Sequence, residues 1–376
     1  MRRVVLITSH APSLINFRGG LITYLVSQGA EVVAMAPNFD ADSRRQLAEL
    51  GGRSVDFELK RTGINPLIDV LSVLDLYTKL RLVKADIVLS YFIKPVVYGT
   101  FAAWMARVPN RFAMIEGLGY VFTHPVKDLN WKGRTVRQLV TVLYRGALSL
   151  AKKVVFLNPD DQREFVDRLI TKQEKTICLG GIGIDLQKWR FMPLPSKMTS
   201  FLMVARLLRE KGVHEYAAAA ALVKQKYPAI NFVLLGGLDE NPGAISVKQI
   251  TDWHESGVLS WYGHVPVAEF LAQASVFVLP SYREGVPVST MEAMAMGRPI
   301  LTTDVPGCRE TVNQGVNGFM VEPRNAMALA DKMVWMIENA SFLPAMGGAS
   351  RKMAEEKFNA HAINAKLTEI ILEGSS

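Results

Sequence analysis

One segment carries most of the architectural information: VFVLPSYREGVPVSTMEAMAMG, residues 276–297. Its apolar start, residues 276–280, is typical of a buried strand, and residues 291–297 open a helix. Glu284 and Glu292 lie on either side of the Gly-Val-Pro turn between them. This order places two carboxylates beside the backbone N–H groups of a helix N-terminus, as at the mouth of an open α/β sheet. The segment therefore predicts a phosphate-binding site of the kind that holds a sugar nucleotide.

The same alternation of short apolar runs and helical patterns extends along the whole chain. Strands are expected at residues 4–8, 31–36, 53–57, 86–90 and 111–115, and again at 200–205, 230–235, 258–262, 275–279 and 299–303. Helical periodicity occurs at 20–27, 43–50, 66–83 and 96–107. Strands that alternate with helices predict βαβ units and parallel sheets. The expected fold class is therefore α/β, with two successive parallel sheets.

The length of 376 residues exceeds the size at which one hydrophobic core usually keeps growing, so two domains are expected. Between the two series of strands, Gly180-Gly-Ile-Gly-Ile-Asp185 and Pro193-Leu-Pro195 are rich in turn formers. We place the first domain at residues 1–190 and the second at 191–358. Residues 359–376 are expected to form a C-terminal helix.

Composition excludes several classes of protein. No window approaches the roughly 18 consecutive apolar residues of a membrane span, and the apolar run near the start is too short for a signal peptide. Cys178 and Cys308 lie far apart without a metal-ligand pattern, so neither a disulfide framework nor a zinc site is indicated. A cytoplasmic location is expected.

Positive charge is concentrated in the first half of the chain. Residues 1–190 contain 27 Lys and Arg against 17 Asp and Glu, a net charge of +10, whereas the remainder has a net charge of −2. Basic and apolar residues are interleaved between Lys127 and Lys153: Lys132, Arg134, Arg137, Arg145 and Lys152 alternate with Trp131, Leu139, Val142, Leu143 and Leu148. This pattern favours a helix on an anionic membrane surface, or else an ordinary amphipathic helix with a solvated basic face. Nucleic acid is not an expected partner, because no recognition motif accompanies the charge.

Several further motifs of the chain belong with the Glu284–Glu292 segment. They are Ala205-Arg206-Leu207, Lys211-Gly-Val213, Thr62-Gly-Ile-Asn-Pro66, Glu116-Gly-Leu-Gly119, Gly236-Gly237 with Asp239-Glu-Asn-Pro242, and Pro280-Ser-Tyr-Arg-Glu-Gly285. Together they resemble the retaining glycosyltransferases of family four, which have the GT-B fold of two Rossmann-like domains facing across a cleft. Within that family they resemble the branch that adds N-acetylgalactosamine or a related sugar to polyprenyl-diphosphate-linked saccharides in bacterial glycan assembly. The resemblance covers nearly the whole chain, and it implies that the C-terminal helix packs back on the first domain.

The resemblance implies roles for residues of the second domain. Arg206 and Lys211 are suited to the donor diphosphate, since an Arg offers a planar fork of donors and a Lys a point charge. Glu284 would face hydroxyls of the donor sugar and Glu292 the ribose hydroxyls, because ionised carboxylates only accept hydrogen bonds. Without this context, Arg206 and Lys211 could belong to a solvated loop, and Glu292 could be common capping chemistry. The remaining expected donor-binding residues here are Gly285, Val286, Pro287, Val288 and Gly263.

The first domain carries a second group of candidates. Asn16-Phe-Arg-Gly-Gly20 is expected to follow the first strand as a loop, so that Gly19 and Gly20 let the backbone approach a phosphate of the donor. Glu116 ends the expected strand at 111–115, where many relatives have a histidine. It could accept a hydrogen bond from the donor sugar, orient the acceptor, or only anchor the loop. Arg61, Lys94 and His124 are candidates for binding the acceptor.

No metal and no cofactor are expected. The pair Asp40-Ala-Asp42 has the spacing of a metal-binding motif, but it lies in an expected loop and is interpreted as structural. Fixed cations at Arg206 and Lys211 replace the metal that other sugar transferases use. The missing Gly-X-Gly-X-X-Gly fingerprint speaks against a nicotinamide oxidoreductase.

The sequence thus predicts a retaining, metal-independent hexosyltransferase. It would move a hexose or N-acetylhexosamine, with GalNAc as the best guess, from a UDP-sugar to an undecaprenyl-diphosphate-linked saccharide. Such an enzyme would act in surface polysaccharide or glycoprotein glycan assembly, peripherally at the inner face of the plasma membrane. A UDP-sugar epimerase and a non-catalytic sugar-nucleotide-binding protein are the alternatives. Residue types leave the donor open between gluco and galacto configurations.

Overall fold

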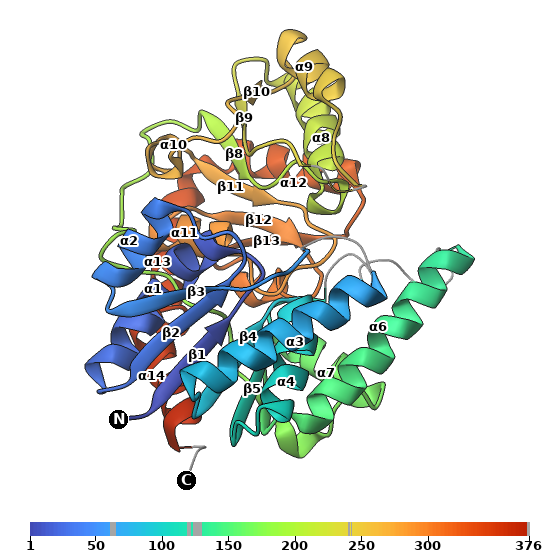
Figure 1. Cartoon of the computed structure of the whole chain (residues 1–376). Coiled ribbons are helices and arrows are strands. Elements are labelled where there is room, and N and C mark those ends of the chain that lie inside the picture. The colour runs from blue at the N-terminus through green and yellow to red at the C-terminus, as the bar shows by residue number, and fades with distance from the viewer. Residues whose placement is uncertain (61–64, 119–121, 123–129, 240, 242, 374–376) are drawn as a thin grey trace. The chain divides into compact units, whose positions relative to one another are not determined.

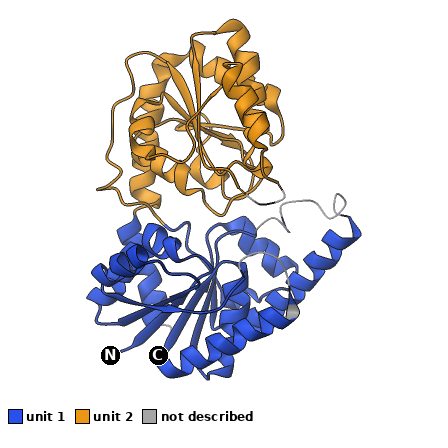
Figure 2. Ribbon diagram, turned by 45° about the horizontal axis from the view of Figure 1, so that its top comes forward, with its two compact units in different colours: residues 1–182, 360–376 blue, residues 183–359 orange. Residues whose placement is uncertain are grey.

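The structure, a computed structural model, describes residues 1–60, 65–118, 122, 130–239, 241 and 243–373. The chain divides into two compact units (Figure 2). Unit 1 contains residues 1–182 together with 360–376, and unit 2 contains residues 183–359. The chain therefore leaves unit 1 once and returns to it at the end.

Unit 1 is built on a seven-stranded parallel sheet with the order β3-β2-β1-β4-β5-β6-β7 (Figure 1). Its strands are β1 (Arg3–Ile7), β2 (Glu31–Ala36), β3 (Gly52–Asp56), β4 (Ile87–Tyr91), β5 (Asn110–Ile115), β6 (Lys153–Phe156) and β7 (Thr176–Cys178). Its helices are α1 (Ala11–Ser27), α2 (Ala41–Glu49), α3 (Pro66–Val83), α4 (Ile93–Met105), α6 (Trp131–Leu150), α7 (Pro159–Asp167) and α14 (Ala360–Glu373). The strand order reverses between β1 and β4, which marks the carboxyl edge there as the usual ligand-binding edge of an open sheet.

Unit 2 repeats this plan with a six-stranded parallel sheet of order β10-β9-β8-β11-β12-β13. Its strands are β8 (Ser200–Val204), β9 (Asn231–Leu235), β10 (Ser260–Trp261), β11 (Val276–Leu279), β12 (Ile300–Thr303) and β13 (Gly318–Val321). Its helices are α8 (Val213–Lys226), α9 (Val247–Glu255), α10 (Val267–Gln273), α11 (Val288–Ala295), α12 (Ala326–Glu338) and α13 (Leu343–Lys357). Here the order reverses between β8 and β11, so the loops that follow these two strands meet at the switch point.

Local sequence accounts for where these elements begin. After Arg3, the central strand β1 is a continuous apolar run buried on both faces, and so is β11, as parallel strands covered by helices require. Polar side chains cap several of the helices: Asp40 accepts a hydrogen bond from the Ser43 N–H at the start of α2, and Asn65 accepts one from the Ile68 N–H at the start of α3. Asp40 and Asp42 thus belong to a helix start, since Asp42 pairs with Arg45 in the first turn.

The fold class expected from the sequence is confirmed, and each of the ten expected strands overlaps an observed one. Strands β6, β7 and β13, of three or four residues each, are not among the expected strands. The expected boundary near residue 190 compares with a division after Ile182, and α14 belongs to unit 1.

The expected loop at residues 16–20 is wrong. These residues lie inside α1, which begins at Ala11 with a proline in its first turn. Gly20 is explained by packing, because a Cβ there would stand 2.8 Å from the Asn364 side chain of α14. A Cβ on Gly19 would meet Leu50 at 3.4 Å. The argument for Gly19 and Gly20 as a phosphate loop is therefore lost.

Candidate functional site

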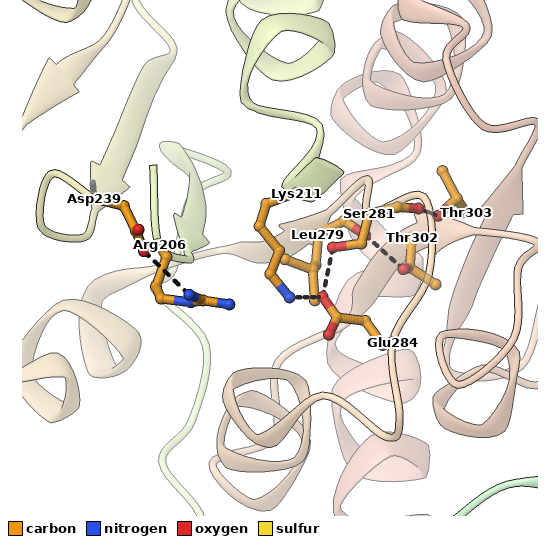
Figure 3. Close-up of polar contacts among 8 residues, drawn as sticks. All are labelled: Arg206, Lys211, Asp239, Leu279, Ser281, Glu284, Thr302 and Thr303. Atoms are coloured by element: carbon orange, nitrogen blue, oxygen red, sulfur yellow. Dashed lines mark hydrogen bonds and ion pairs between the residues drawn. The ribbon is translucent and has the colours of Figure 1, made fainter. Parts of the chain in front are cut away.

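The switch point of unit 2 is formed by two loops. The first runs from β8 through Arg206 to the short 3-10 helix η3 (Arg209–Lys211), which leads into α8. The second runs from β11 through Glu284 to α11. The structure confirms the order of strand, loop and helix that the sequence predicts for residues 276–297. It also brings together two motifs that lie far apart along the chain (Figure 3).

Lys211 and Glu284 form an ion pair between the loops. Lys211 Nζ lies 2.6 Å from Glu284 Oε1, and the two side chains are only 17% and 12% exposed. The Ser281 hydroxyl donates to the same carboxylate oxygen at 2.7 Å (Figure 3). A charge-assisted hydrogen bond between half-buried groups is stronger and less screened than a surface pair. The contact therefore holds a cation and a carboxylate in fixed positions at the edge of the sheet.

Arg206 lies beside this pair on a more open part of the edge (Figure 3). Its Nη1 is 3.0 Å from Asp239 Oδ2, and the Arg206 side chain is 55% exposed. Burial raises the pKa of Asp239, but hydrogen bonds from Asn241 and the Arg206 charge outweigh that effect and hold the pKa below its usual value. Asp239 therefore stays ionised and orients the guanidinium of Arg206, which remains exposed and accessible to a ligand.

Two glycines allow the loops to touch. Gly212 has a φ of +76°, and a Cβ there would stand 2.1 Å from the Pro280 carbonyl oxygen. Gly307 has a φ of +79°, and its Cβ would stand 2.4 Å from the carbonyl oxygens of Glu284 and Gly285. Both positions need a left-handed backbone and close approach, which only glycine supplies without strain. The motif residue Gly212 thus fixes the distance between Lys211 and the loop of Glu284.

The start of α11 closes the site. The helix begins at Val288 with Pro287 as its N-cap residue, so the backbone N–H groups of its first turn point toward the edge of the sheet. Pro287 itself has no N–H and contributes shape only. Glu292 lies in the second turn rather than the first, which argues against a capping role. Burial raises the pKa of Glu292 to about 7, and the Lys188 charge opposes part of this rise.

In unit 1, Glu116 follows β5 at the carboxyl edge of the sheet and forms an ion pair with Arg18. Arg18 is almost completely buried and lies over the Tyr91 ring, 4.9 Å from its centroid. Burial lowers the pKa of this arginine to about 10. The sequence missed Arg18, because residues 16–20 were interpreted as a loop. The apolar spacing of residues 14, 21, 22 and 25 was the signal that could have placed it on a helix.

The remaining candidates are more dispersed. Lys94 Nζ donates to Asp69 Oδ1 at 3.0 Å and to the Lys60 carbonyl at 2.8 Å, so it is held within unit 1. Gly263 has a φ of +68° with open space around it, and its carbonyl accepts from the Gly236 N–H. Arg61 and His124 lie outside the described residues. Among the residues that are described, no group of three or more His, Cys, Asp or Glu side chains could hold a metal ion.

Several described basic residues of the segment between Lys127 and Lys153 make contacts within unit 1. Arg137 is buried, 3.8 Å from Glu164, and Arg145 donates to the carbonyls of Arg168 and Leu169. Lys152 and Lys153 also donate to groups of unit 1, namely Asn110 Oδ1 and the Glu174 carbonyl. Much of the charge that was expected on an outward face, toward a membrane or toward solvent, is therefore engaged within unit 1. No described helix is both long and apolar enough to cross a membrane.

Comparisons with known proteins place this fold and site in a class of sugar-transferring enzymes. Residues 199–339, which include the switch-point loops, match the family described as Glycosyl transferases group 1. The chain is 31% identical over 347 residues to the N,N'-diacetylbacillosaminyl-diphospho-undecaprenol alpha-1,3-N-acetylgalactosaminyltransferase of Campylobacter jejuni, with 88% of each chain covered. It belongs to the group 1 glycosyl transferases.

Two further comparisons agree with this family. The chain is 26% identical over 275 residues to the UDP-Gal:alpha-D-GlcNAc-diphosphoundecaprenol alpha-1,3-galactosyltransferase of Escherichia coli, covering 69% of this chain and 68% of the relative. The crystal structure of Anabaena Alr3699/HepE in complex with UDP and glucose has a TM-score of 0.78 at 16% identity, with 99% of this chain and 100% of that chain covered. The latter likeness confirms the GT-B fold class expected from the sequence.

Proposed function

We propose that this glycosyltransferase moves an N-acetylhexosamine or hexose, with N-acetylgalactosamine as the first choice, from a UDP-sugar to an undecaprenyl-diphosphate-linked saccharide. The Lys211–Glu284 pair at the switch point carries the proposal, because it sets a cation and a hydroxyl acceptor side by side where a sugar diphosphate would lie. The Campylobacter relative, whose name contains both the transferred sugar and the lipid-linked acceptor, supports this choice of substrates.

Each charged group of unit 2 has a role in the proposal. Lys211 and Arg206 bind the diphosphate, together with the N-terminal backbone N–H groups of α11. Glu284 accepts hydrogen bonds from hydroxyls of the donor sugar, and its link to Ser281 and Lys211 fixes its orientation. Glu292 accepts from the ribose hydroxyls. Hydrogen bonds from the ribose hydroxyls favour the ionised form of Glu292, so they would lower its raised pKa on binding.

The reaction proceeds with retention and without a metal in this proposal. The acceptor oxygen forms a bond to the anomeric carbon on the face from which UDP departs, while the bond from that carbon to the phosphate oxygen breaks. The acceptor proton passes to the departing phosphate. Lys211 and Arg206 stabilise the growing negative charge on the diphosphate, which is the electrostatic contribution that dominates many enzymatic rate enhancements.

Glu116 and Lys94 are the proposed acceptor-side residues of unit 1. Glu116 would orient the acceptor through a hydroxyl, with its carboxylate positioned by Arg18. Lys94 would reach the acceptor diphosphate only by exchanging its contact with Asp69. An acceptor with a polyprenyl tail would place the enzyme at the inner face of the plasma membrane as a peripheral protein.

The first experiment incubates the purified chain with a panel of UDP-sugars and a short-chain polyprenyl-diphosphate N-acetylhexosamine in the presence of EDTA. Mass spectrometry should detect one added sugar from one donor. Activity that EDTA abolishes and manganese restores would refute metal independence. Conversion of a UDP-sugar in the absence of acceptor would favour the epimerase instead, and an inverted anomer in the product would refute retention.

A further inference from the structure

Two helices of unit 1 present apolar side chains on their outward faces. On α3, five large residues are between 44% and 81% exposed: Leu67, Val70, Leu71, Leu74 and Leu82. At about 100° per residue they fall within roughly a third of the helix circumference. The opposite face of α3 carries Leu76 and Leu80, which are buried in the core. The outward face of α3 therefore carries five large apolar side chains beside the exposed Thr78 and Arg81, more apolar surface than a solvated helix requires.

The outward face of α6 has a similar apolar centre. Trp131, Leu139 and Val142 are between 44% and 73% exposed, and they fall within about 80° of one another on the helix. Lys132 borders this apolar strip on one side, and Arg134 lies on the other. The twenty residues of α6 include no Asp or Glu. An apolar centre between cationic borders, with a Trp at one end, is the pattern of a helix that lies in a membrane interface.

Both helices belong to one surface. α4 contacts α3 and α6, and all three cover the same part of the sheet (Figure 1). α4 is buried along most of its length and exposes large apolar side chains only at its end, at Trp104 and Met105. Scattered exposed hydrophobic residues are normal, but here they are concentrated on two helices that both pack on α4, and a concentration of exposed apolar residues marks a binding surface.

We infer that the outward faces of α3 and α6 form a lipid-insertion surface, in which apolar side chains enter the headgroup region of an anionic bilayer. This inference rests on the proposed lipid-linked acceptor. It assigns most of the affinity for the membrane to exposed apolar side chains and not to the basic segment. Electrostatic attraction is secondary here, because Arg137, Arg145, Lys152 and Lys153 are engaged within unit 1.

The charge distribution favours a lipid surface over a second copy of the chain. A two-fold dimer through this face would bring the same patch of each copy together, and so set the cations of α6 against those of its partner. Without acidic residues on α6, that arrangement has no compensating ion pairs from this helix. Anionic lipid headgroups supply the missing negative charge, while the acyl region accepts the leucines of α3.

The test is flotation of the full chain with vesicles of phosphatidylglycerol and phosphatidylethanolamine. Leu71→Gln/Leu74→Gln should lower the partition coefficient about tenfold, because two leucines lose their apolar contact. The matched control is Leu222→Gln/Met327→Gln, which changes two exposed apolar residues of unit 2 and should float like the wild type. Raising NaCl from about 0.05 M to about 0.5 M should remove only a minor part of the binding, since salt screens charge and not apolar insertion.

Three outcomes would overturn the inference: equal flotation of the α3 variant and the wild type, complete release by salt alone, or a wild-type dimer that the α3 variant converts to a monomer. Thermal unfolding should be nearly unchanged in both variants. Transfer to the short-chain acceptor in solution separates the two proposals. If the wild type transfers sugar but the α3 variant floats equally well, only the lipid-insertion surface is refuted. If flotation depends on α3 but no sugar is transferred, only the proposed function is refuted.

Discussion

Lys211 and Glu284 are 73 residues apart in the chain, yet their charged atoms lie 2.6 Å apart at the switch point. The ion pair makes the two residues depend on each other. Removal of the lysine leaves a half-buried carboxylate with the Ser281 hydroxyl as its remaining described contact at Oε1. The cost of an unpaired buried charge then adds to the loss of the phosphate contact that we propose for Lys211. We therefore treat the two residues as one functional unit.

Lys211→Ala should reduce kcat/KM for sugar transfer by about 100-fold or more, because one electrostatic contact to the departing diphosphate is lost. Steady-state kinetics with the UDP-sugar that the panel identifies would measure this. Lys226→Ala is the matched control: Lys226 is an exposed lysine of α8 that pairs with Glu338, and its loss should leave the rate unchanged. A Lys211 variant that folds and keeps near-wild-type turnover would contradict the assignment.

Glu292 makes stability depend on pH. Its pKa is raised from 4.5 to about 7 in the folded chain, so the folded state holds a proton that the unfolded state releases between these values. Stability from this residue is therefore present below pH 4.5 and is lost as the pH rises through about 7. Glu292→Gln, which cannot ionise, should unfold about 3 °C or more above the wild type at pH 8. That gain should shrink at pH 5.

Thermal unfolding of both chains at the two pH values, without ligand, measures this difference. Glu338→Gln serves as a control, because Glu338 is exposed and its pKa is lowered by the hydrogen bond from Lys226. A gain for Glu292→Gln that is equal at pH 5 and pH 8 would show that packing, and not ionisation, is responsible.

The sequence predicts the positions of site residues best when those residues lie close together in the chain. Glu284 and the start of α11 belong to one segment, and strand, loop and helix follow from its pattern. Arg18 could not be found in this way, because Gly19 and Gly20 suggested a loop. Their small size instead accommodates Leu50 and Asn364, which are distant in sequence. Likewise, nothing local in the sequence indicates that Arg137 is buried against Glu164.

Among the elements, the junction between η3 and α8 sets the geometry of the site. Gly212→Ala should destabilise the chain and reduce activity together, because its Cβ would overlap the Pro280 carbonyl and push the two loops apart. Gly257→Ala is the matched control, since Gly257 has a similar φ of +71° but open space around it. In both variants the alanine adopts a left-handed conformation, which costs about 1–2 kcal/mol. Any additional loss of stability in the Gly212 variant is therefore due to the overlap with the Pro280 carbonyl.

Denaturant unfolding and transfer assays on the two variants would measure the difference. Equal destabilisation of both, with activity retained, would show that the loop of Glu284 moves freely to accommodate the added methyl group.

The bounds of a helix could be predicted where capping residues and a long periodic pattern indicated the same range. The range of α3 agrees with the helical periodicity of residues 66–83, and Asn65 and Pro66 mark its start. Strands β6, β7 and β13 are not among the expected strands, and length alone does not explain this, because the equally short β10 and β11 are. The expected start of α1, near Gly20, is wrong. The adjacent Gly19 and Gly20 suggest a loop, whereas the helix begins at Ala11 with a proline in its first turn.

For the whole molecule, the division into two units predicts separable effects of core mutations. Leu367 of α14 and Leu329 of α12 are both almost completely buried, in unit 1 and unit 2 respectively. Each change to Ala should cost about 2–5 kcal/mol in its own unit. Leu329→Ala should also weaken UDP binding, whereas Leu367→Ala should leave the Kd for UDP unchanged.

Calorimetric unfolding and titration with UDP would test both variants side by side. A Leu367 variant that loses UDP affinity as strongly as the Leu329 variant would contradict donor binding within unit 2. The sequence indicated two sheets, but the placement of residues 359–376 on the first domain came from family resemblance, since helical periodicity does not specify which sheet a helix covers.

The return of α14 to unit 1 has a consequence for biosynthesis. The ribosome makes residues 183–359 before α14, so unit 2 can complete its sheet while unit 1 still lacks a helix that packs on α1. Until α14 emerges, the nascent chain exposes the face of α1 that Ile363, Leu367 and Ile371 later help to cover. Unit 1 thus begins before unit 2 and is completed after it, which departs from the usual N-terminal-first order and leaves the face of α1 available to chaperones during synthesis.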